Sequence, residues 1–274
     1  MTFGALKQLT RTLDLRLGHY VGEFVTPGIG YMLKEAGCEY CFLDTEHSGM
    51  GFDVLNRTLR FMEAASMPTM VRVPSSRYDH IARALDVGAQ GIVIPMLGSL
   101  EQARSVIASM KYTPAGRRGV APGLGNDRYR IRPVTEMLRE SNEQTVFVAL
   151  IETAEGVAQV DEIAALPEID VLHVGHFDMS CSLGIPGAFD DRRFLDAMAR
   201  VVAAGRKHGK ALGRMVSTPE EGIAMAAEGW NMICYGGDVW LYQTALRQGL
   251  DAIRREAVVG GAGPGGPSKT PKGN

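Results

Sequence analysis

Apolar and polar positions alternate along the chain at two different spacings. Short runs in which most side chains are apolar occur eight times between residues 21 and 235, and each run has the length of a strand. They comprise residues 21–25, 41–43, 69–73, 91–95, 146–151, 171–174, 211–215 and 232–235. The run at 91–95 has no charged side chain, which is typical of a parallel strand that is buried on both faces.

Between these runs the apolar side chains recur every three or four positions, which is the spacing of an amphipathic helix. Leu55, Leu59 and Met62, for example, share one face of a helix predicted at 52–65. The predicted helices comprise residues 31–36, 52–65, 78–86, 100–110, 154–166, 192–208, 219–228 and 239–255. Eight strand–helix repeats within about 240 residues favour a closed (β/α)8 TIM barrel over an open doubly wound α/β sheet.

Two stretches interrupt this alternation. Residues 112–132 have no regular period, and a loop of this length in a compact domain is usually functional or disordered. Its arginines are expected to bind an anionic substrate or the acids of a neighbouring subunit, or else to be solvated surface charges. They are Arg117, Arg118, Arg128, Arg130 and Arg132. Residues 259–274 are rich in glycine and proline and predict a flexible tail, which leaves 1–17 as an N-terminal segment and 18–258 as a single barrel domain.

The composition is that of an ordinary globular protein, with 45% apolar and 22% charged residues and a formal net charge of −2. This balance predicts no nucleic-acid or membrane partner, and no apolar run approaches the length of a membrane span. Charged residues interrupt the first 17 positions, so we expect a cytoplasmic protein without a signal peptide. Cys38 and Cys41 form a C-x-x-C pair without the second pair of a zinc ribbon, which favours small buried side chains.

Polar side chains gather where the predicted strands end. Asp44 and His47 follow the second strand, Arg72 ends the third, and Glu152 and Asp178 follow the fifth and sixth. The carboxyl ends of all eight strands meet at one face of such a barrel, and active sites lie there. Asp44, three residues before His47, is expected to orient the imidazole as a general base. Arg72 is expected either to face a developing oxyanion or to form a salt bridge inside the barrel.

Glu152 and Asp178 come from neighbouring strands. Two carboxylates at one mouth suit a hard divalent cation such as Mg²⁺ or Mn²⁺, with open positions for substrate and water. An acid pair for glycoside cleavage is the alternative, although Trp230 and Trp240 are the only tryptophans available as sugar platforms. Pairing of both acids with barrel arginines is a purely structural alternative.

Five segments, taken in order and with their spacing, resemble the HpcH/HpaI family of class II, metal-dependent aldolases that act on 2-keto-3-deoxy acids. They are LDTEH (43–47), VRVP (71–74), LDVGAQG (85–91), YTPAGRRG (112–119) and IET (151–153). The resemblance implies a (β/α)8 barrel, commonly a homohexamer built as a trimer of dimers that exchange their C-terminal helix. It also implies that Glu152 and Asp178 hold Mg²⁺, Mn²⁺ or Co²⁺, which pyruvate would chelate, and that Arg72 stabilises the enolate oxygen.

The resemblance implies roles for four further positions. His47, paired with Asp44, would act as the acid/base through a metal-bound water. The backbone amides of Phe177 and Asp178 would bind the pyruvate carboxylate. Asp86 matches an acid that such enzymes present to the active site of a neighbouring subunit.

The chain departs from the family pattern at two places. Leu150 stands where glutamine is common, which removes a polar group near the water on the metal. The segment GHFDMS (175–180) stands where the family has Gly-Pro-Ala-Asp-Leu-Ser. Phe177 is bulkier than alanine and should narrow the substrate pocket, while His176 is either a second acid/base or a hydrogen-bonded spacer. These departures affect the expected substrate more than the expected metal.

The sequence therefore predicts a metal-dependent aldolase. It would reversibly cleave a 2-keto-(3-deoxy) hydroxy acid to pyruvate, or a related 2-keto acid, and an aldehyde through a metal-stabilised enolate. A 2-keto acid decarboxylase or an acyl-CoA lyase that uses the same enolate site is the alternative. A non-catalytic protein that binds keto acids is a third hypothesis, from a different class of function.

Overall fold

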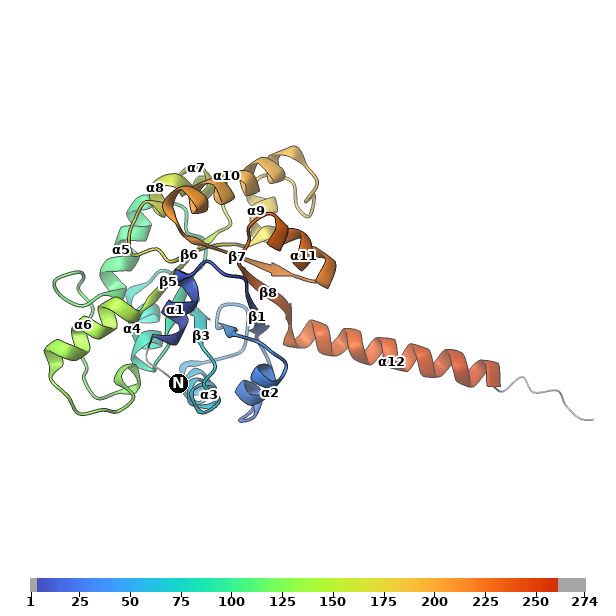
Figure 1. The fold of residues 1–274 in the computed structure, drawn as a ribbon, viewed down its shortest axis with the longest axis horizontal. Coiled ribbons are helices and arrows are strands. Elements are labelled where there is room, and N and C mark those ends of the chain that lie inside the picture. The colour runs from blue at the N-terminus through green and yellow to red at the C-terminus, as the bar shows by residue number, and fades with distance from the viewer. Residues whose placement is uncertain (1–3, 261–274) are drawn as a thin grey trace, which may run out of the picture. The chain divides into compact units, whose positions relative to one another are not determined.

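The computed structural model describes residues 4–260, with side chains described through residue 257. Eight parallel strands close into a barrel in which each strand pairs with its neighbours in sequence and β8 pairs with β1 (Figure 1). The strands are β1 (Arg16–Val21), β2 (Tyr40–Asp44), β3 (Thr69–Arg72), β4 (Gly91–Ile94), β5 (Val146–Ile151), β6 (Val171–Val174), β7 (Ala211–Val216) and β8 (Met232–Gly237). The predicted (β/α)8 barrel is confirmed.

Helices lie between successive strands, before β1 and after β8. They are α1 (Ala5–Arg11), α2 (Ile29–Glu35), α3 (Phe52–Ala64), α4 (Tyr78–Asp86), α5 (Leu100–Met110), α6 (Val134–Gln144), α7 (Ala154–Ala158), α8 (Val160–Ala164), α9 (His176–Ser182), α10 (Arg192–His208), α11 (Pro219–Ala227) and α12 (Asp238–Gly260), with a 3₁₀ turn, η1, at Gly125–Asp127. The sequence predicts α4, α5 and α10 with the observed bounds. In α10, the Asp191 carboxylate accepts the Arg193 N–H (2.8 Å) at the start, and Gly209 at the end adopts a φ of 62°.

The alternation of side chains along each strand places polar groups in the barrel mouth. Tyr40 and Phe42 of β2 point into the barrel, and Asp44, two residues further, continues the same inward series. Met70 leads to Arg72 on β3 in the same way. The intervening side chains face the helices, so both faces of the sheet are buried and the strands are largely apolar.

The segment before β1 packs against the barrel, and β1 itself begins at Arg16, two residues before the predicted start of the barrel domain. Leu6 of α1 is fully buried in the inner core, and Lys7 Nζ lies 2.5 Å from Asp170 Oδ1, just before β6. Because these contacts are at the amino ends of the strands, α1 closes that end. The first strand comprises Arg16–Val21 instead of the predicted 21–25, and it pairs with β2 and β8. The polar residues of this segment gave it no apolar run, so the sequence pattern did not predict it.

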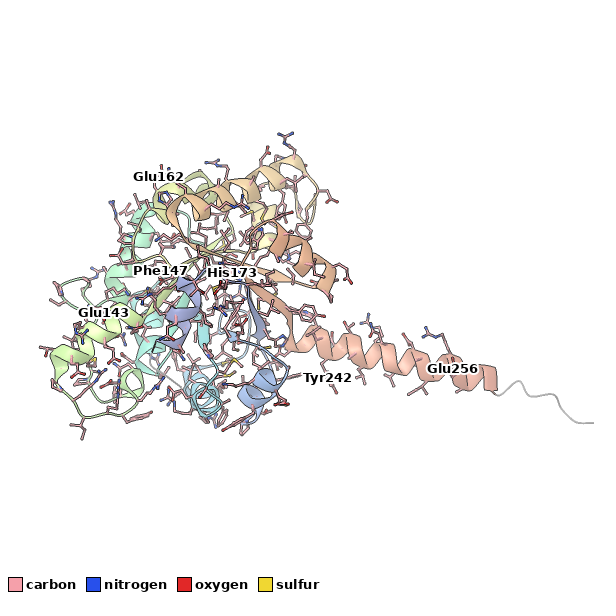
Figure 2. The ribbon with its side chains drawn as sticks, in the orientation of Figure 1. Glu143, Phe147, Glu162, His173, Tyr242 and Glu256 are labelled. Atoms are coloured by element: carbon pink, nitrogen blue, oxygen red, sulfur yellow. The ribbon has the colours of Figure 1, made fainter. Side chains whose placement is uncertain are left out.

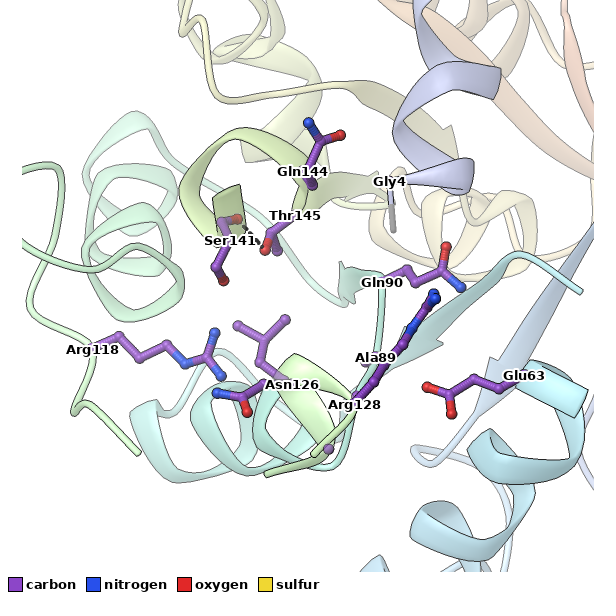
Figure 3. A pocket seen from close by; sticks show the side chains of 13 residues that line it. Gly4, Glu63, Ala89, Gln90, Arg118, Asn126, Arg128, Ser141, Gln144 and Thr145 are labelled. Carbon is purple, nitrogen blue, oxygen red and sulfur yellow. Dashed lines mark hydrogen bonds between the residues drawn. The ribbon is translucent and has the colours of Figure 1, made fainter. Parts of the chain in front are cut away.

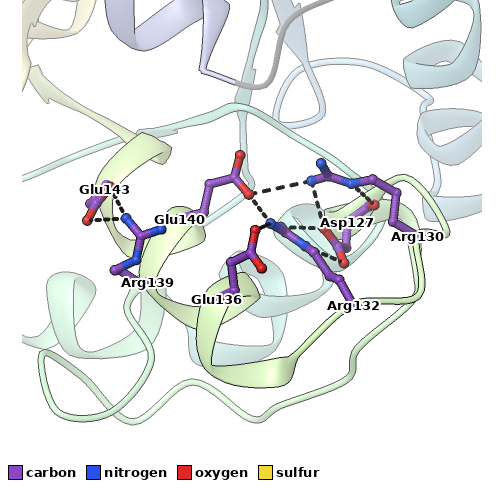
Figure 4. A network of polar contacts seen from close by, with 7 residues as sticks. All are labelled: Asp127, Arg130, Arg132, Glu136, Arg139, Glu140 and Glu143. Atoms are coloured by element: carbon purple, nitrogen blue, oxygen red, sulfur yellow. Dashed lines mark hydrogen bonds and ion pairs between the residues drawn. The ribbon is translucent and has the colours of Figure 1, made fainter.

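The arginine-rich stretch 112–132 lies at the end of the barrel opposite the carboxyl ends of the strands. It connects the end of α5 to α6 and β5, and α5 runs antiparallel to the strands. Arg130 and Arg132 pair with Asp127, and Arg132 also pairs with Glu140 of α6 (Figure 4). These arginines therefore do not line the mouth of their own barrel, and the expectation that they bind its substrate is wrong.

A shallow pocket that is open to solvent lies at this same end (Figure 3). Its lining includes Gln90 before β4, Thr145 before β5, and Arg118 and Asn126 from the arginine-rich stretch. These residues precede strands or lie in the loops between helix and strand, so the pocket is remote from the polar groups that end β2, β3 and β5.

The chain divides into two compact units, one ending at Asp238 and the other beginning at Val239. The second unit contains α12, which extends to Gly260, beyond the predicted end of the helix at 255. The predicted flexible tail lies outside the described residues beyond Gly260. No helix in the range 4–260 is both long and apolar enough to cross a membrane.

Leu6→Ala tests whether α1 belongs to the barrel core. We expect the free energy of unfolding to fall by about 2–5 kcal/mol, the usual cost of emptying a buried leucine site, in urea titrations followed by circular dichroism. Leu15→Ala, at a side chain that is 48% exposed, is the control and should change it by about 0.5 kcal/mol or less. Equal, small effects of both variants would contradict the packing of α1 against the barrel.

Candidate active site at the carboxyl ends of the strands

The Asp44 carboxylate at the end of β2 is fully buried and accepts hydrogen bonds from several directions. Arg72 donates from Nε to Oδ1 (2.7 Å) and from Nη2 to Oδ2 (2.8 Å), which is a bidentate pair between neighbouring strands. The Tyr20 hydroxyl donates to Oδ2 (2.6 Å), and the Glu46 N–H donates to Oδ1 (3.0 Å). Burial alone would raise the pKa of Asp44, but the Arg72 hydrogen bonds and charge outweigh it and hold the pKa below its usual value.

His47 is near Asp44, but not in the way that the sequence predicts. Its backbone N–H donates to Asp44 Oδ2 (3.2 Å), while its imidazole is 63% exposed and has Nε2 3.7 Å from Glu46 Oε2. The predicted pairing of the imidazole with Asp44 is therefore wrong. Arg72, Tyr20 and two backbone amides already occupy the Asp44 oxygens.

Arg72 forms the salt bridge that was one of its two predicted roles. Besides Asp44, its Nε lies 3.3 Å from Glu46 Oε2, and its guanidinium lies 5.7 Å from the centre of the Phe42 ring. Burial alone would lower the pKa of Arg72, but the hydrogen bonds to Asp44 and its charge outweigh burial and raise the pKa above its usual value. The guanidinium therefore stays charged. Its position is fixed by contacts on the strand side, and its side chain remains 13% exposed at the mouth.

Glu46 is a fourth acid at the mouth, besides Asp44, Glu152 and Asp178, and is not among the predicted site residues. Burial raises its pKa, the charges of Asp44 and Asp178 raise it further, and Arg72 opposes them. The only sequence signal was its place inside the LDTEH segment. The mouth thus holds more negative charge than the predicted pair of metal ligands would supply.

Glu152, which follows β5, is 2% exposed and is held by backbone on two sides. The Met96 N–H donates to Glu152 Oε1 (2.7 Å), and Met96 adopts a φ of 52°, which is unusual for a residue other than glycine. Glu152 Oε2 also lies close to Gly175. A Cβ at position 175 would be 2.0 Å from this oxygen, so only glycine fits there without a shift of Glu152. The supporting roles of Met96 and Gly175 have no signature in the sequence.

The pKa of Glu152 is raised to about 7, first by burial and then by the negative charges of Asp178 and Glu46, against the opposing Met96 hydrogen bond. Asp178 is exposed on the first turn of α9, just after β6. The structure therefore brings the predicted pair, Glu152 and Asp178, into electrostatic contact.

These residues fit a hard divalent cation. Among the side chains described, no group of three or more His, Cys, Asp or Glu residues forms a complete metal cage. Magnesium is commonly bound by one or two carboxylates, with water and substrate as its other ligands. Glu152 and Asp178 supply such a donor set, and a bound cation would offset the burial and the repulsion that raise the pKa of Glu152.

His176 and Phe177 form an aromatic group beside Asp178. The His176 ring lies 4.5 Å from the Phe177 ring and 5.3 Å from the Phe189 ring, measured between centroids. Burial and the charge of Arg214 lower the pKa of His176 to about 4, so its imidazole is neutral at pH 7. His173 of β6 is a second neutral imidazole, inside the barrel (Figure 2), and burial together with the charge of Arg72 lowers its pKa to about 3.

Asp86 is the one predicted site residue that lies away from the mouth of its own barrel. It ends α4, at the amino ends of the strands, and its Oδ1 accepts a hydrogen bond from Arg118 Nη2 (2.5 Å). Its side chain is 30% exposed. Asp86 therefore does not line the mouth of its own barrel.

A (β/α)8 barrel with clustered acids and a paired arginine at the carboxyl ends of its strands has the architecture of an enzyme. The chain belongs to the HpcH/HpaI aldolase/citrate lyase family, whose model matches residues 31–245. A Delftia acidovorans protein named hydroxypyruvate/pyruvate aldolase is 30% identical over 258 residues, 94% of this chain and 95% of that protein. A Paraburkholderia phytofirmans protein of the same name is 32% identical over 228 residues, 81% and 87% of the two chains. Among solved structures, a family member from Burkholderia cenocepacia has a TM-score of 0.86 at 29% identity, covering 92% of this chain and 99% of that one.

The raised pKa of Glu152 makes stability depend on pH when no metal is bound. Its pKa of about 7 in the fold exceeds the ordinary 4.5, so the folded chain binds this proton more tightly than the unfolded chain does. Its contribution to stability is therefore present in full below pH 4.5 and is lost as the pH rises to 7, on the order of 3 kcal/mol at most. Thermal unfolding with chelator should show this decline in the wild type and not in Glu152→Gln.

Addition of Mg²⁺ should then raise the unfolding temperature more at pH 8 than at pH 5.5, because the cation competes with the proton on Glu152. Glu101→Gln, at an exposed carboxylate on α5, is the control and should behave as the wild type. A magnesium effect of equal size at both pH values, or one that persists in Glu152→Gln, would contradict this assignment.

Proposed function

We propose that this chain is a divalent-metal-dependent aldolase that interconverts a 2-keto hydroxy acid with pyruvate, or a related 2-keto acid, and an aldehyde. The observation that carries the proposal is the set of acids Glu46, Glu152 and Asp178 beside the clamped guanidinium of Arg72. The names of the relatives support pyruvate or hydroxypyruvate as the keto acid.

The reaction begins with loss of a proton from the carbon next to the keto group. That carbon then forms a bond to the aldehyde carbonyl carbon, whose oxygen takes up a proton; cleavage is the reverse. Mg²⁺, Mn²⁺ or Co²⁺ held by Glu152 and Asp178 would supply Lewis acidity to the keto oxygen. A guanidinium has five N–H groups, and Asp44 takes two of those on Arg72, which leaves donors for the enolate oxygen.

The acid/base in this proposal is His47, oriented by Glu46 instead of Asp44. The exposed imidazole and the Glu46 carboxylate stand next to each other at the mouth, where a substrate proton can be exchanged. The backbone amides of Phe177 and Asp178, in the first turn of α9, are proposed to bind the keto-acid carboxylate. Asp86 of a second subunit is proposed to approach the same mouth.

A decarboxylase or an acyl-CoA lyase would use the same enolate and is the second candidate. The family includes citrate lyases, and Leu150 provides no polar group near the site. Turnover of oxaloacetate without any aldehyde-dependent reaction would favour it. Binding of pyruvate without turnover of any keto acid would instead support the non-catalytic hypothesis.

Exchange of the C-3 protons of pyruvate for deuterium, followed by NMR without an aldehyde, tests the enolate step by itself. We expect exchange that requires Mg²⁺, Mn²⁺ or Co²⁺, stops on chelation and returns when metal is added. Glu152→Gln should lower the rate by at least about 100-fold, since loss of one preorganised stabilising group costs 10²–10³. Glu101→Gln should leave it unchanged, and full exchange by chelated enzyme or by Glu152→Gln would refute the proposed site.

We further propose a cytoplasmic homohexamer, built as a trimer of dimers that exchange α12. The four cysteines are free, which agrees with a reducing compartment. Tyr242, Leu246, Leu250 and Ile253 recur along α12 at helical spacing and are each at least 42% exposed, so they offer an apolar stripe for a second copy of the chain.

Light scattering tests this assembly. The wild type should have six times the chain mass of 29.6 kDa, and the double substitution Leu246→Glu, Leu250→Glu should reduce the mass to that of smaller species. Exposed Glu256 on the same helix supplies the control Glu256→Gln, which should keep the wild-type mass. A monomeric wild type, or a hexamer unaffected by the double substitution, would contradict helix exchange.

A further inference from the structure

Phe177 stands at the mouth with its side chain 63% exposed, whereas Phe42, Phe147 and Phe194 are at most 2% exposed. It immediately precedes Asp178, so the two Cα atoms are about 3.8 Å apart. A single exposed apolar residue is ordinary on a protein surface. Phe177 differs from such a residue because it lies beside the acids of the proposed site.

The Phe177 ring is also supported from behind. It lies 4.5 Å from the His176 ring and 5.4 Å from the Phe189 ring, which meets it edge-on at 75°. Phe189 in turn lies 5.3 Å from the buried ring of Phe194 on α10. His176, Phe177 and Phe189, called the aromatic platform below, are therefore anchored in the core while Phe177 keeps an open surface.

We propose that the aromatic platform binds the substituent of the aldehyde, and that this substituent is aromatic or branched aliphatic. The inference rests on the proposed aldolase function. The bond-forming carbons must approach to about 3–3.5 Å, and the keto acid is proposed to lie at Asp178. The aldehyde substituent would then lie close enough to contact the Phe177 ring.

The chemistry of the mouth is less favourable for two other classes of aldehyde. A polyhydroxylated chain would lose water from its hydroxyl groups against ring faces that return no comparable hydrogen bond. A carboxylated or phosphorylated aldehyde would meet the negative charges of Glu46 and Asp178, while the donors of Arg72 that its ion pairs leave are proposed to serve the enolate oxygen. An apolar substituent avoids both costs.

Aldol addition to pyruvate tests the inference with two aldehydes, benzaldehyde and glyceraldehyde. The wild type should have the higher kcat/KM with benzaldehyde. Phe177→Ala should lower that value about 10- to 100-fold, mainly through KM, and change the value for glyceraldehyde less than about 2-fold. Phe177→Leu should retain part of the preference, and Ile223→Ala, at a 72% exposed side chain on α11, should retain all of it.

Pyruvate exchange without aldehyde separates this inference from the proposed function. Exchange is measured for both proteins, and each kcat/KM of Phe177→Ala is corrected for any difference in its exchange rate; absence of exchange from the wild type would refute the aldolase itself. With exchange intact, equal kcat/KM values for the two aldehydes in the wild type, or equal losses in Phe177→Ala, would overturn the aromatic subsite. A lower molar mass of Phe177→Ala in light scattering would overturn it too, by assigning Phe177 to a subunit contact.

Discussion

The buried carboxylate of Asp44 organises one side of the barrel mouth. An unpaired charge at full burial would be prohibitively costly, so the fold must supply hydrogen-bond donors to it. Arg72, Tyr20 and the backbone after β2 provide them. Those same bonds fix the guanidinium, orient the LDTEH turn and place Glu46 and His47 at the opening. The chemistry of the mouth thus follows from the need to satisfy one carboxylate.

On the opposite side of the mouth, the Glu152 carboxylate is buried with too little positive charge around it to keep its pKa low. Glu152 has a backbone amide from Met96 and close contact with Gly175, but burial and the acids around it still raise its pKa to about 7. Such an arrangement is unfavourable in an isolated protein and favourable once a divalent cation binds. One side therefore carries a fixed cation, Arg72, and the other side is suited to an exchangeable one.

The sequence predicts the barrel because eight apolar runs alternate with helical periods, and it predicts the mouth because side-chain alternation carries Asp44, Arg72 and Glu152 inward. It does not predict which donor reaches Asp44. Sequence proximity favoured the His47 imidazole, but the neighbouring strand delivers a bidentate guanidinium that occupies both oxygens. Met96 and Gly175 act through backbone position, which no residue pattern encodes. α6 was missed because only Met137 and Ser141 of that helix are buried, which leaves a weak apolar period.

The direction of the chain explains why the arginines of residues 112–132 do not line the mouth of the barrel. A helix that follows a strand returns the chain to the amino end of the barrel. Residues 112–132 and Asp86 follow or end such helices, so they lie at the end of the barrel opposite the mouth. Their charges are neutralised there, as in the pairs of Arg118 with Asp86 and of Arg132 with Asp127. The end of the barrel at which a charged residue lies is therefore better evidence for a role in the active site than the presence of the charge in the sequence.

The central claim is that Glu152 and Asp178 form a divalent-cation site that the keto acid joins. Electron paramagnetic resonance of Mn²⁺ titrated into the chelator-treated protein measures this directly. The account predicts one tightly bound Mn²⁺ per chain, a spectrum that changes when pyruvate is added, and loss of both features in Asp178→Asn. Absence of bound Mn²⁺ from the wild type, or an unchanged pyruvate-sensitive spectrum in Asp178→Asn, would contradict it.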